Sequence, residues 1–119
     1  MTRVIPKNEW KSFFDILSRE RRGWETAIQV LDDAAGAQMM SEGLAFNGMT
    51  LEEHGGNTVL ELLIGSDATS HQTHNIFGPL KVAYERNQTG PGGTLDIEDR
   101  AGTVTLVNFY QPKPANVGI

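Results

Sequence analysis

The sequence predicts a mainly β protein with one N-terminal α-helix, and two observations lead to this fold class. A β-hairpin is indicated near the C-terminus, where residues 94–98 alternate polar and apolar and residues 103–110 are dense in β-branched and aromatic side chains. Similar short stretches follow one another across turn residues, whereas a helical period occurs only near the N-terminus. We therefore expect a small antiparallel β-barrel or a strongly bent sheet of six or seven strands, with the helix packed on it; an open α+β antiparallel sheet is the alternative.

The helix is expected over residues 6–22. Large apolar side chains recur there at the spacing of one helical face: Trp10, Phe13, Phe14 and Leu17. Pro6 is accepted in a first helical turn, and Gly23 is a typical C-terminal stop. Because aromatic rings dominate this stripe, we expect the helix to be docked against the rest of the protein.

Short runs of β-type residues are bounded by Gly, Asn, Asp and Pro, which predicts a series of strands after the helix. They are expected at residues 24–31, 37–46, 49–53, 58–64, 73–86, 94–98 and 103–110. The stretch 58–64 is apolar on nearly both faces, which is typical of a central, covered strand, and the helix is its obvious cover. The tail at 112–119 contains prolines and is expected to fray.

Composition limits the class of protein more than its activity. A chain of 119 residues is expected to form one domain, residues 1–119. The absence of cysteine excludes disulfides, Cys-ligated zinc and a thiol nucleophile. The net charge of −5 argues against nucleic acid or an anionic membrane as the main partner. Without an apolar run of about 18 residues or an apolar leader, neither a transmembrane helix nor a signal peptide is expected, and the cytoplasm is the default location.

Four short stretches of the chain together resemble one known family. They are 5–10 (Ile-Pro-Lys-Asn-Glu-Trp), 22–24 (Arg-Gly-Trp), 70–76 (Ser-His-Gln-Thr-His-Asn-Ile) and 102–109 (Gly-Thr-Val-Thr-Leu-Val-Asn-Phe). Their order and spacing resemble those of a family of small bacterial proteins known only as a domain of unknown function. The resemblance covers most of the chain and implies a stand-alone bacterial protein. It brings with it no activity, cofactor or catalytic residue.

The histidines are the clearest candidates for chemistry. His71 and His74 lie three residues apart, in or beside a polar loop that also contains Asp67. A zinc site needs three or four ligands, which His54 or Asp67 would have to complete through the fold. The candidate metal ligands are therefore His71, His74, His54 and Asp67. In a second interpretation the histidines bond backbone carbonyls and organise the loop, and in a third they contact a ligand or partner.

Other reactive residues have simpler structural interpretations. Asp32 and Asp33 lie in an expected turn, where an aspartate bonding its own backbone is favoured over a bound cation. The run 19–22 (Arg-Glu-Arg-Arg) suits an anion or phosphate, but it also compensates the dipole at the helix C-terminus. The remaining carboxylates fall on expected exposed faces or turns: Glu52, Glu53, Asp96, Glu98 and Asp99.

No catalytic residue and no cofactor are assigned. The chain lacks a nucleophile elbow, a dinucleotide fingerprint and a phosphate loop, and the 90–93 stretch (Gly-Pro-Gly-Gly) is not followed by a helix. Ser70 beside His71 is sequence adjacency alone and does not make a nucleophile and base pair. Nucleic acid is not expected, because the basic residues do not interleave with the aromatic ones.

Two functions from different classes remain. The preferred one is a non-enzymatic binding or interaction module, which contacts a protein partner or a second copy through an edge strand and residues 65–79. The alternative is a metal-binding protein or small metal-dependent enzyme that uses His71 and His74 with His54 or Asp67. Small-molecule sensing in the mouth of a barrel is a further interpretation.

Overall fold

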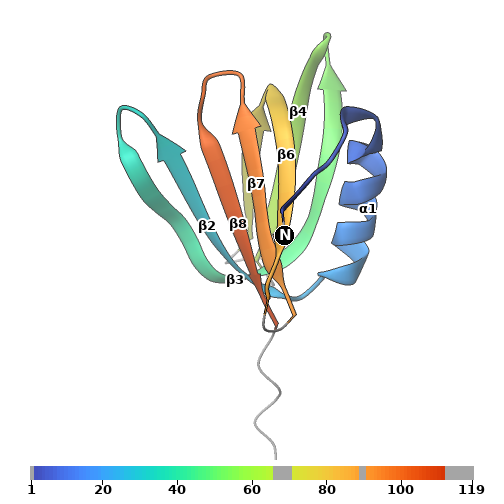
Figure 1. Cartoon of the computed structure of the whole chain (residues 1–119), viewed down its shortest axis with the longest axis vertical. Helices are drawn as coiled ribbons and strands as arrows, with labels where there is room; N and C mark the ends of the chain where they lie inside the picture. Colours follow the sequence, from blue (N-terminus) through green and yellow to red (C-terminus); the bar gives the residue numbers. More distant parts are fainter. Residues whose placement is uncertain (1, 66–70, 89–90, 112–119) are drawn as a thin grey trace, which may run out of the picture.

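A computed structural model of the chain shows one antiparallel sheet with a helix against it (Figure 1). It describes residues 2–65, 71–88 and 91–111, so the predicted tail at 112–119 lies outside the described residues. The elements are β1 (Thr2–Val4), a 3-10 turn (Lys7–Glu9), α1 (Trp10–Glu20), β2 (Glu25–Asp32), β3 (Gly36–His54), β4 (Asn57–Ile64), β5 (Gln72–Phe77), β6 (Pro79–Arg86), β7 (Gly93–Asp99) and β8 (Val104–Tyr110). The prediction of a mainly β protein with an N-terminal helix is confirmed.

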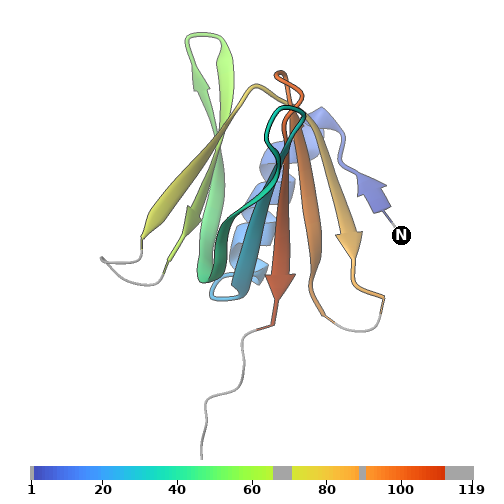
Figure 2. The same ribbon diagram turned by 90° about the vertical axis from the view of Figure 1, so that its left-hand side faces the viewer.

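The long strand β3 divides the sheet into two halves. The strand order is β1-β6-β7-β8-β2-β3-β4-β5. The first half of β3 pairs with β2, and its second half pairs with β4 from Phe46 onward. Register shifts interrupt both ladders of β3, and such irregularities bend and twist a strand. Figure 2 shows the result, in which β4 and β5 turn away from the other strands and α1 lies behind the space between them.

The sheet does not close, so the predicted barrel is wrong and the open antiparallel sheet is correct. In the part of the chain that the structure describes, β1 and β5 end the strand order, and no pairing joins them. The helix supplies the physical reason, because Trp10, Phe14 and Leu17 belong to the same buried cluster as core side chains from both halves of the sheet. Helical side chains therefore fill space that a closed barrel would enclose with strands alone.

The described residues form eight strands rather than six or seven. The expected strand at 73–86 is two strands, because the chain turns at Gly78 and β6 starts at Pro79. The additional strand β1 consists of three exposed residues, which are too few to show a periodic pattern.

The expected strands at 37–46 and 49–53 are one continuous strand, β3. Asn47 and Gly48 suggested a hairpin turn in the sequence. In the structure they lie at a register shift between β3 and β4, where the strand continues instead of reversing. A bulge and a turn use the same residue types, which is why the sequence pattern misled.

The predicted C-terminal hairpin is confirmed as β7 and β8. The two strands pair antiparallel from Gly93 opposite Phe109 to Glu98 opposite Val104. The carboxylate of Asp99 closes the turn, because its Oδ1 accepts hydrogen bonds from the backbone N–H groups of Ala101 at 2.9 Å and Thr103 at 3.0 Å. This turn forms one wall of the candidate site, through Arg100 and Ala101.

The helix is shorter than expected and lies mainly against β3. The predicted span 6–22 contains a 3-10 turn followed by α1. Ser18 fixes the contact with β3, since its Oγ accepts the N–H of Met49 at 2.9 Å and lies 3.3 Å from the Met49 carbonyl oxygen. On the other side, Phe13 meets the ring of Tyr84 in β6 edge to face. Among the described residues, no helix is long and apolar enough to cross a bilayer.

The expectation that both faces of β4 are covered is only partly correct. One face is fully in the core: Leu60, Leu62 and Ile64. On the other face Val59 is buried, but Glu61 and Leu63 are only half-buried. The helix therefore covers β4 less than the sequence suggested, because its contact is with β3.

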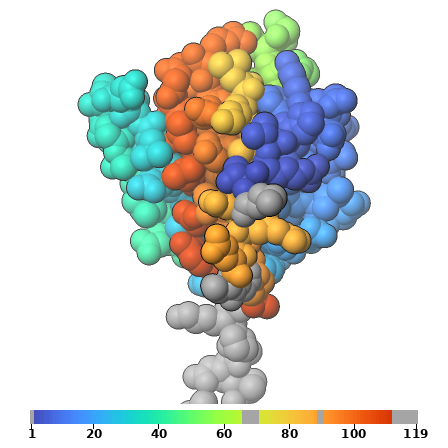
Figure 3. Space-filling model, in the orientation of Figure 1, coloured from blue at the N-terminus to red at the C-terminus, as the bar shows by residue number. Residues whose placement is uncertain are grey.

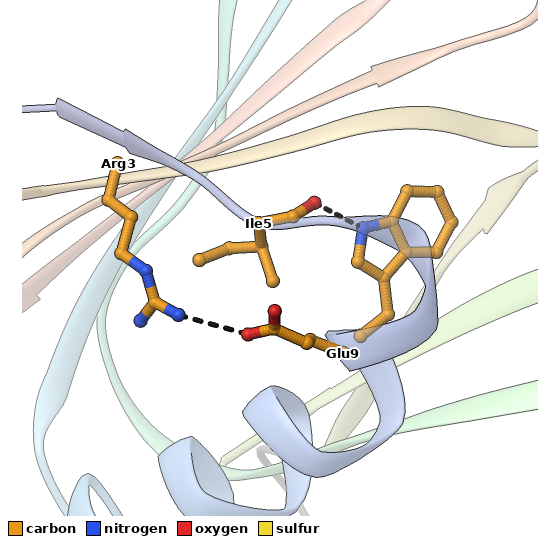
Figure 4. A network of polar contacts seen from close by, with 4 residues as sticks. Arg3, Ile5 and Glu9 are labelled. Carbon is orange, nitrogen blue, oxygen red and sulfur yellow. Dashed lines mark hydrogen bonds and ion pairs between the residues drawn. The ribbon is translucent and has the colours of Figure 1, made fainter.

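The N-terminal segment connects the helix to β6. Its strand β1 pairs with β6, and the segment and β6 lie side by side on the face shown in Figure 3. The backbone N–H of Ile5 donates to the Val82 carbonyl at 2.8 Å. The carbonyl oxygen of Ile5 accepts the indole N–H of Trp10 at 2.9 Å. On the surface, Arg3 and Glu9 form an ion pair at 3.1 Å (Figure 4). Residues 2–10 therefore link α1 to β6 at the β1 end of the open sheet.

Candidate functional site

The exposed edge of β5 is the first part of the candidate site. β5 pairs with β4 on one side, from Gln72 opposite Ile64 to Phe77 opposite Val59, without a register shift. On its other side, no strand of the described chain pairs with it. The strand contains no proline and no acidic residue, Lys or Arg, the features that usually protect an edge. The backbone groups of β5 are therefore available to an additional strand.

A hollow at the C-terminal end of β5 is the second part. It has a volume of about 470 Å³, and it lies between the start of β4, the corner from β5 to β6 and the turn from β7 to β8. Its walls are Asn57, Thr58, Val59, Phe77, Gly78, Arg100 and Ala101. Phe77 is 66% exposed, the highest value among the exposed large apolar side chains of the described residues.

The backbone around the hollow is fixed by hydrogen bonds. Gly78 donates its N–H to the Thr58 carbonyl at 2.9 Å and accepts the N–H of Arg100 at 2.9 Å. Its φ of +65° is a conformation that only glycine adopts readily. A Cβ on Gly78 would also lie 3.3 Å from the Cβ of Arg100. Glycine at this corner therefore lets the Arg100 side chain pack against the turn from β5 to β6.

The structure separates two of the four candidate metal ligands, His54 and His74. His54 pairs with Asn57 at the start of β4, whereas His74 pairs with Leu62, five residues further along the same strand. That spacing corresponds to about 17 Å along a strand. Asp67 lies outside the described residues, and within them no three His, Cys, Asp or Glu side chains gather in a way that could hold a metal. Coordination by His71, His74 and Asp67 stays a prediction.

The two histidines of the 71–74 stretch have different environments. His71 is exposed and precedes β5. His74 is half-buried, and it lies opposite Leu62, so its side chain shares the face of the sheet that carries the core. Burial lowers the pKa of His74.

The sequence interpretation of Asp32 as a turn residue is confirmed. Its Oδ1 accepts the backbone N–H of Ala34 at 2.8 Å. Several of the carboxylates expected on exposed faces or turns are half-buried instead: Glu52, Asp96, Glu98 and Asp99. Asp96 on β7 stands apart among them, because its buried Oδ1 has no hydrogen-bond partner among the described residues. Burial and the neighbouring charge of Glu98 raise the pKa of Asp96. Period-2 alternation places this residue on the outer face but gives no sign that the face is partly covered.

Comparisons with known proteins identify the family but no activity. A family model described as "Family of unknown function (DUF5335)" matches residues 1–117. An "Uncharacterized protein" of Aquifex aeolicus (strain VF5) is 27% identical over 116 residues, which cover 96% of this chain and 94% of that protein. No solved structure matches the chain. The match over nearly the whole chain confirms the resemblance found in the four sequence stretches, and the bacterial relative agrees with the origin that the resemblance implied.

Proposed function

Since the chain belongs to the family of unknown function DUF5335, whose description gives no activity, we propose that it is a binding module for an extended segment of a partner protein. The segment adds to the sheet as a strand beside β5. One observation carries the proposal: an unprotected, regular edge strand ends in an exposed Phe77 beside a hollow. Main-chain hydrogen bonds to β5 provide affinity, and the hollow provides selectivity.

The geometry indicates the chemistry of the partner segment. Side chains directly opposite each other on neighbouring strands share one face, so a partner residue opposite Phe77 lies on the same face as Phe77 and Val59. Its apolar side chain would cover Phe77. Arg100 lines the same hollow and forms no ion pair with any described residue, so it would attract a carboxylate of the partner segment. We therefore expect an apolar residue opposite Phe77 and an acidic residue near it.

Within the described residues, β1 and the first half of β3 also have a side without a paired strand, and both are poorer templates. β1 has only three residues, which offer too few hydrogen bonds for stable pairing. The first half of β3 has no strand on its far side, but its ladder with β2 contains two register shifts. Such shifts distort the row of backbone groups that a new strand would need. β5 has neither defect.

Peptide selection tests the proposal. Twelve-residue random peptides would be selected on the intact protein, and the Kd of the best peptide measured by isothermal titration calorimetry. We expect Phe77→Ala to raise the Kd at least tenfold, because exposed aromatic anchors dominate such contacts. Tyr110→Ala is the matched control, since Tyr110 is 51% exposed on β8, outside the hollow. An equal effect of both substitutions would contradict the proposal.

Two further arms identify the mode of binding. A peptide with N-methylated backbone amides at alternate residues should lose binding, because it cannot pair with β5. Arg100→Gln should weaken peptides that carry the acidic residue and leave neutral ones unchanged. If Phe77→Ala instead abolishes a dimer of the protein alone in sedimentation experiments, the segment belongs to a second copy and the proposed partner is wrong.

A further inference from the structure

A second site, far from β5 in the strand order, concerns the arginines at the end of α1. Two hollows meet there. The first, of about 220 Å³, is lined by Arg3, Phe13, Ile16, Leu17, Glu20, Arg21, Tyr84 and Arg86. The second, of about 280 Å³, is lined by Arg21, Arg86, Asn87, Pro91 and Gly92. Arg21 and Arg86 line both hollows, so these two guanidinium groups stand at their junction.

The local charge is opposite to that of the whole chain. The protein carries a net charge of −5. The residues that line the first hollow include three arginines and one carboxylate, Glu20. Those that line the second include two arginines and no carboxylate. Among the described residues, Arg3 is paired with Glu9, whereas neither Arg21 nor Arg86 forms an ion pair. Two unpaired guanidinium groups therefore face the same small space.

Two polar groups beside this junction lack partners. Among the described residues, neither the buried Nε of Arg21 nor the buried hydroxyl of Tyr84 has a hydrogen-bond partner. Leaving a buried donor unsatisfied costs free energy, which a bound acceptor would recover. Both groups line the first hollow with Arg86. Arg21, Tyr84 and Arg86, from the end of α1 and from β6, therefore line one hollow, and two of them carry a buried polar atom that no described residue pairs with.

Compensation of the helix dipole does not explain this arrangement. Arg86 ends β6 and has no part in the helix terminus. The side chain of Arg21 lies over the ring of Trp24, with its Cζ 4.5 Å from the ring centroid, instead of bonding the last helical carbonyls through Nε. Arg19 and Arg22 remain exposed at the helix end, where they suit that role.

Hydrogen bonds from Asn87 hold Pro91 and Gly92 in the wall of the second hollow. The N–H of Asn87 donates to the Gly92 carbonyl at 3.1 Å, and its side-chain Nδ2 donates to the Pro91 carbonyl at 3.0 Å. A Cβ on Gly93 would lie 2.7 Å from the Tyr84 hydroxyl. Glycine at this position therefore lets the Tyr84 ring and hydroxyl pack against the backbone of β7.

We propose that Arg21, Arg86 and the Tyr84 hydroxyl bind the phosphate group of a small molecule. Guanidinium groups match phosphate oxygens with paired, charge-assisted hydrogen bonds, and a tetrahedral dianion offers enough acceptors for all three donors. The hollows accommodate a phosphate and a small organic group attached to it. The ligand is either free phosphate or a phosphate monoester, and this site is independent of the β5 surface.

Titration with inorganic phosphate and with phenyl phosphate tests the proposal, with ionic strength held constant by KCl. We expect saturable binding seen by ³¹P NMR, together with movement of the Arg21 Nε–H resonance. Arg86→Gln and Arg21→Gln should each weaken binding at least tenfold, and Tyr84→Phe several-fold. The matched control is Arg22→Gln, which removes a charge from the same helix end but lines neither hollow.

Each outcome decides the proposal. Tighter binding of phenyl phosphate than of phosphate identifies a monoester as the ligand, and the reverse order identifies free phosphate. Absence of saturable binding to both would overturn the proposal, as would an equal loss in Arg22→Gln. Tighter binding of benzoate than of phenyl phosphate would show a carboxylate site and contradict the phosphate assignment. Circular dichroism confirms that each variant is folded. If Arg21→Gln unfolds the protein, Arg86→Gln at the end of β6 tests the proposal in its place.

Discussion

The indole N–H of Trp10 donates a hydrogen bond to the carbonyl oxygen of Ile5 at 2.9 Å, with both residues buried. This bond joins the first turn of α1 to the segment that pairs with β6. Through it, the helix and the edge of the sheet are held as one unit. The relationship explains how an open sheet keeps its core covered on the side where no strand closes it.

Trp10→Ala should therefore be severely destabilising. The ring is 2% exposed, and removing a buried aromatic side chain costs about 3–5 kcal/mol. Trp10→Phe keeps an aromatic ring but removes the indole N–H donor. It should lower the free energy of unfolding by the cost of the altered packing plus about 1 kcal/mol for the lost hydrogen bond. Urea unfolding measures both. Ile16→Ala is the control on the same helix, since Ile16 is 44% exposed. A loss below about 1 kcal/mol for Trp10→Ala would mean that the helix is not docked as described.

Ser18→Ala tests the contact between α1 and β3. The substitution removes the acceptor for the backbone N–H of Met49 and leaves that group without its partner. Leaving a buried donor unsatisfied costs about 1–3 kcal/mol. Ser12→Ala is the matched control, because Ser12 is exposed on the same helix. Equal free energies of unfolding for the two variants would show that the Ser18 bonds do not hold the helix on β3.

Asp96 should make stability depend on pH in an unusual direction. Its folded-state pKa is raised, first by burial and then by Glu98, against the smaller opposing effect of Lys81. The folded protein therefore keeps this proton longer than the unfolded chain does. Its stabilising contribution is complete below the unfolded pKa of about 3.9 and is lost as the pH rises through the folded pKa.

Asp96→Asn should accordingly raise the free energy of unfolding at pH 7 and change it little near pH 3.5, with urea titrations at both values as the measurement. Asp33→Asn, in the exposed turn before β3, is the control. A stabilisation that is equal at both pH values would exclude titration of Asp96 as its cause.

Metal binding at the 71–74 stretch can be decided separately. Coordination by His71, His74 and Asp67 would raise the Tm with one divalent metal, and the rise would disappear in His74→Ala. The binding-module account expects no metal-specific rise with zinc, nickel or iron in chelator-treated protein. His54→Ala is the control, because β4 places His54 about 17 Å along the strand from His74. A rise that depends on His71 and His74 would revive the metal-dependent alternative.

Local patterns predicted the parts of the fold whose stability is local. The β7–β8 hairpin was predictable because Leu95, Ile97, Val107 and Phe109 alternate toward the core and turn residues join the strands. The openness of the sheet was not, because it depends on where Trp10, Phe14 and Leu17 come to lie in three dimensions. The periodic pattern of a helix shows which face is buried but not which strands that face packs against.

The candidate site shows the same division. Residues 65–79 were predicted as a contact surface, and Phe77 and Gly78 lie within them. Arg100 was missed, because it is more than twenty residues from Phe77 in the sequence and the fold alone brings it to the same hollow, where its N–H bonds the Gly78 carbonyl. That Arg21 and Arg86 line one hollow could not be predicted from the sequence either, since one lies at the end of the helix and the other at the end of a strand.

Amide hydrogen exchange of the protein, alone and with the selected peptide, tests the central claim most directly. If the partner segment adds to β5, the amides of Gln72–Phe77 that have no strand partner in the free protein should exchange at least tenfold more slowly in the complex. The amides of the β2–β3 hairpin should stay unchanged. Protection confined to β1, β3 or the arginine hollows, with none along β5, would contradict the account.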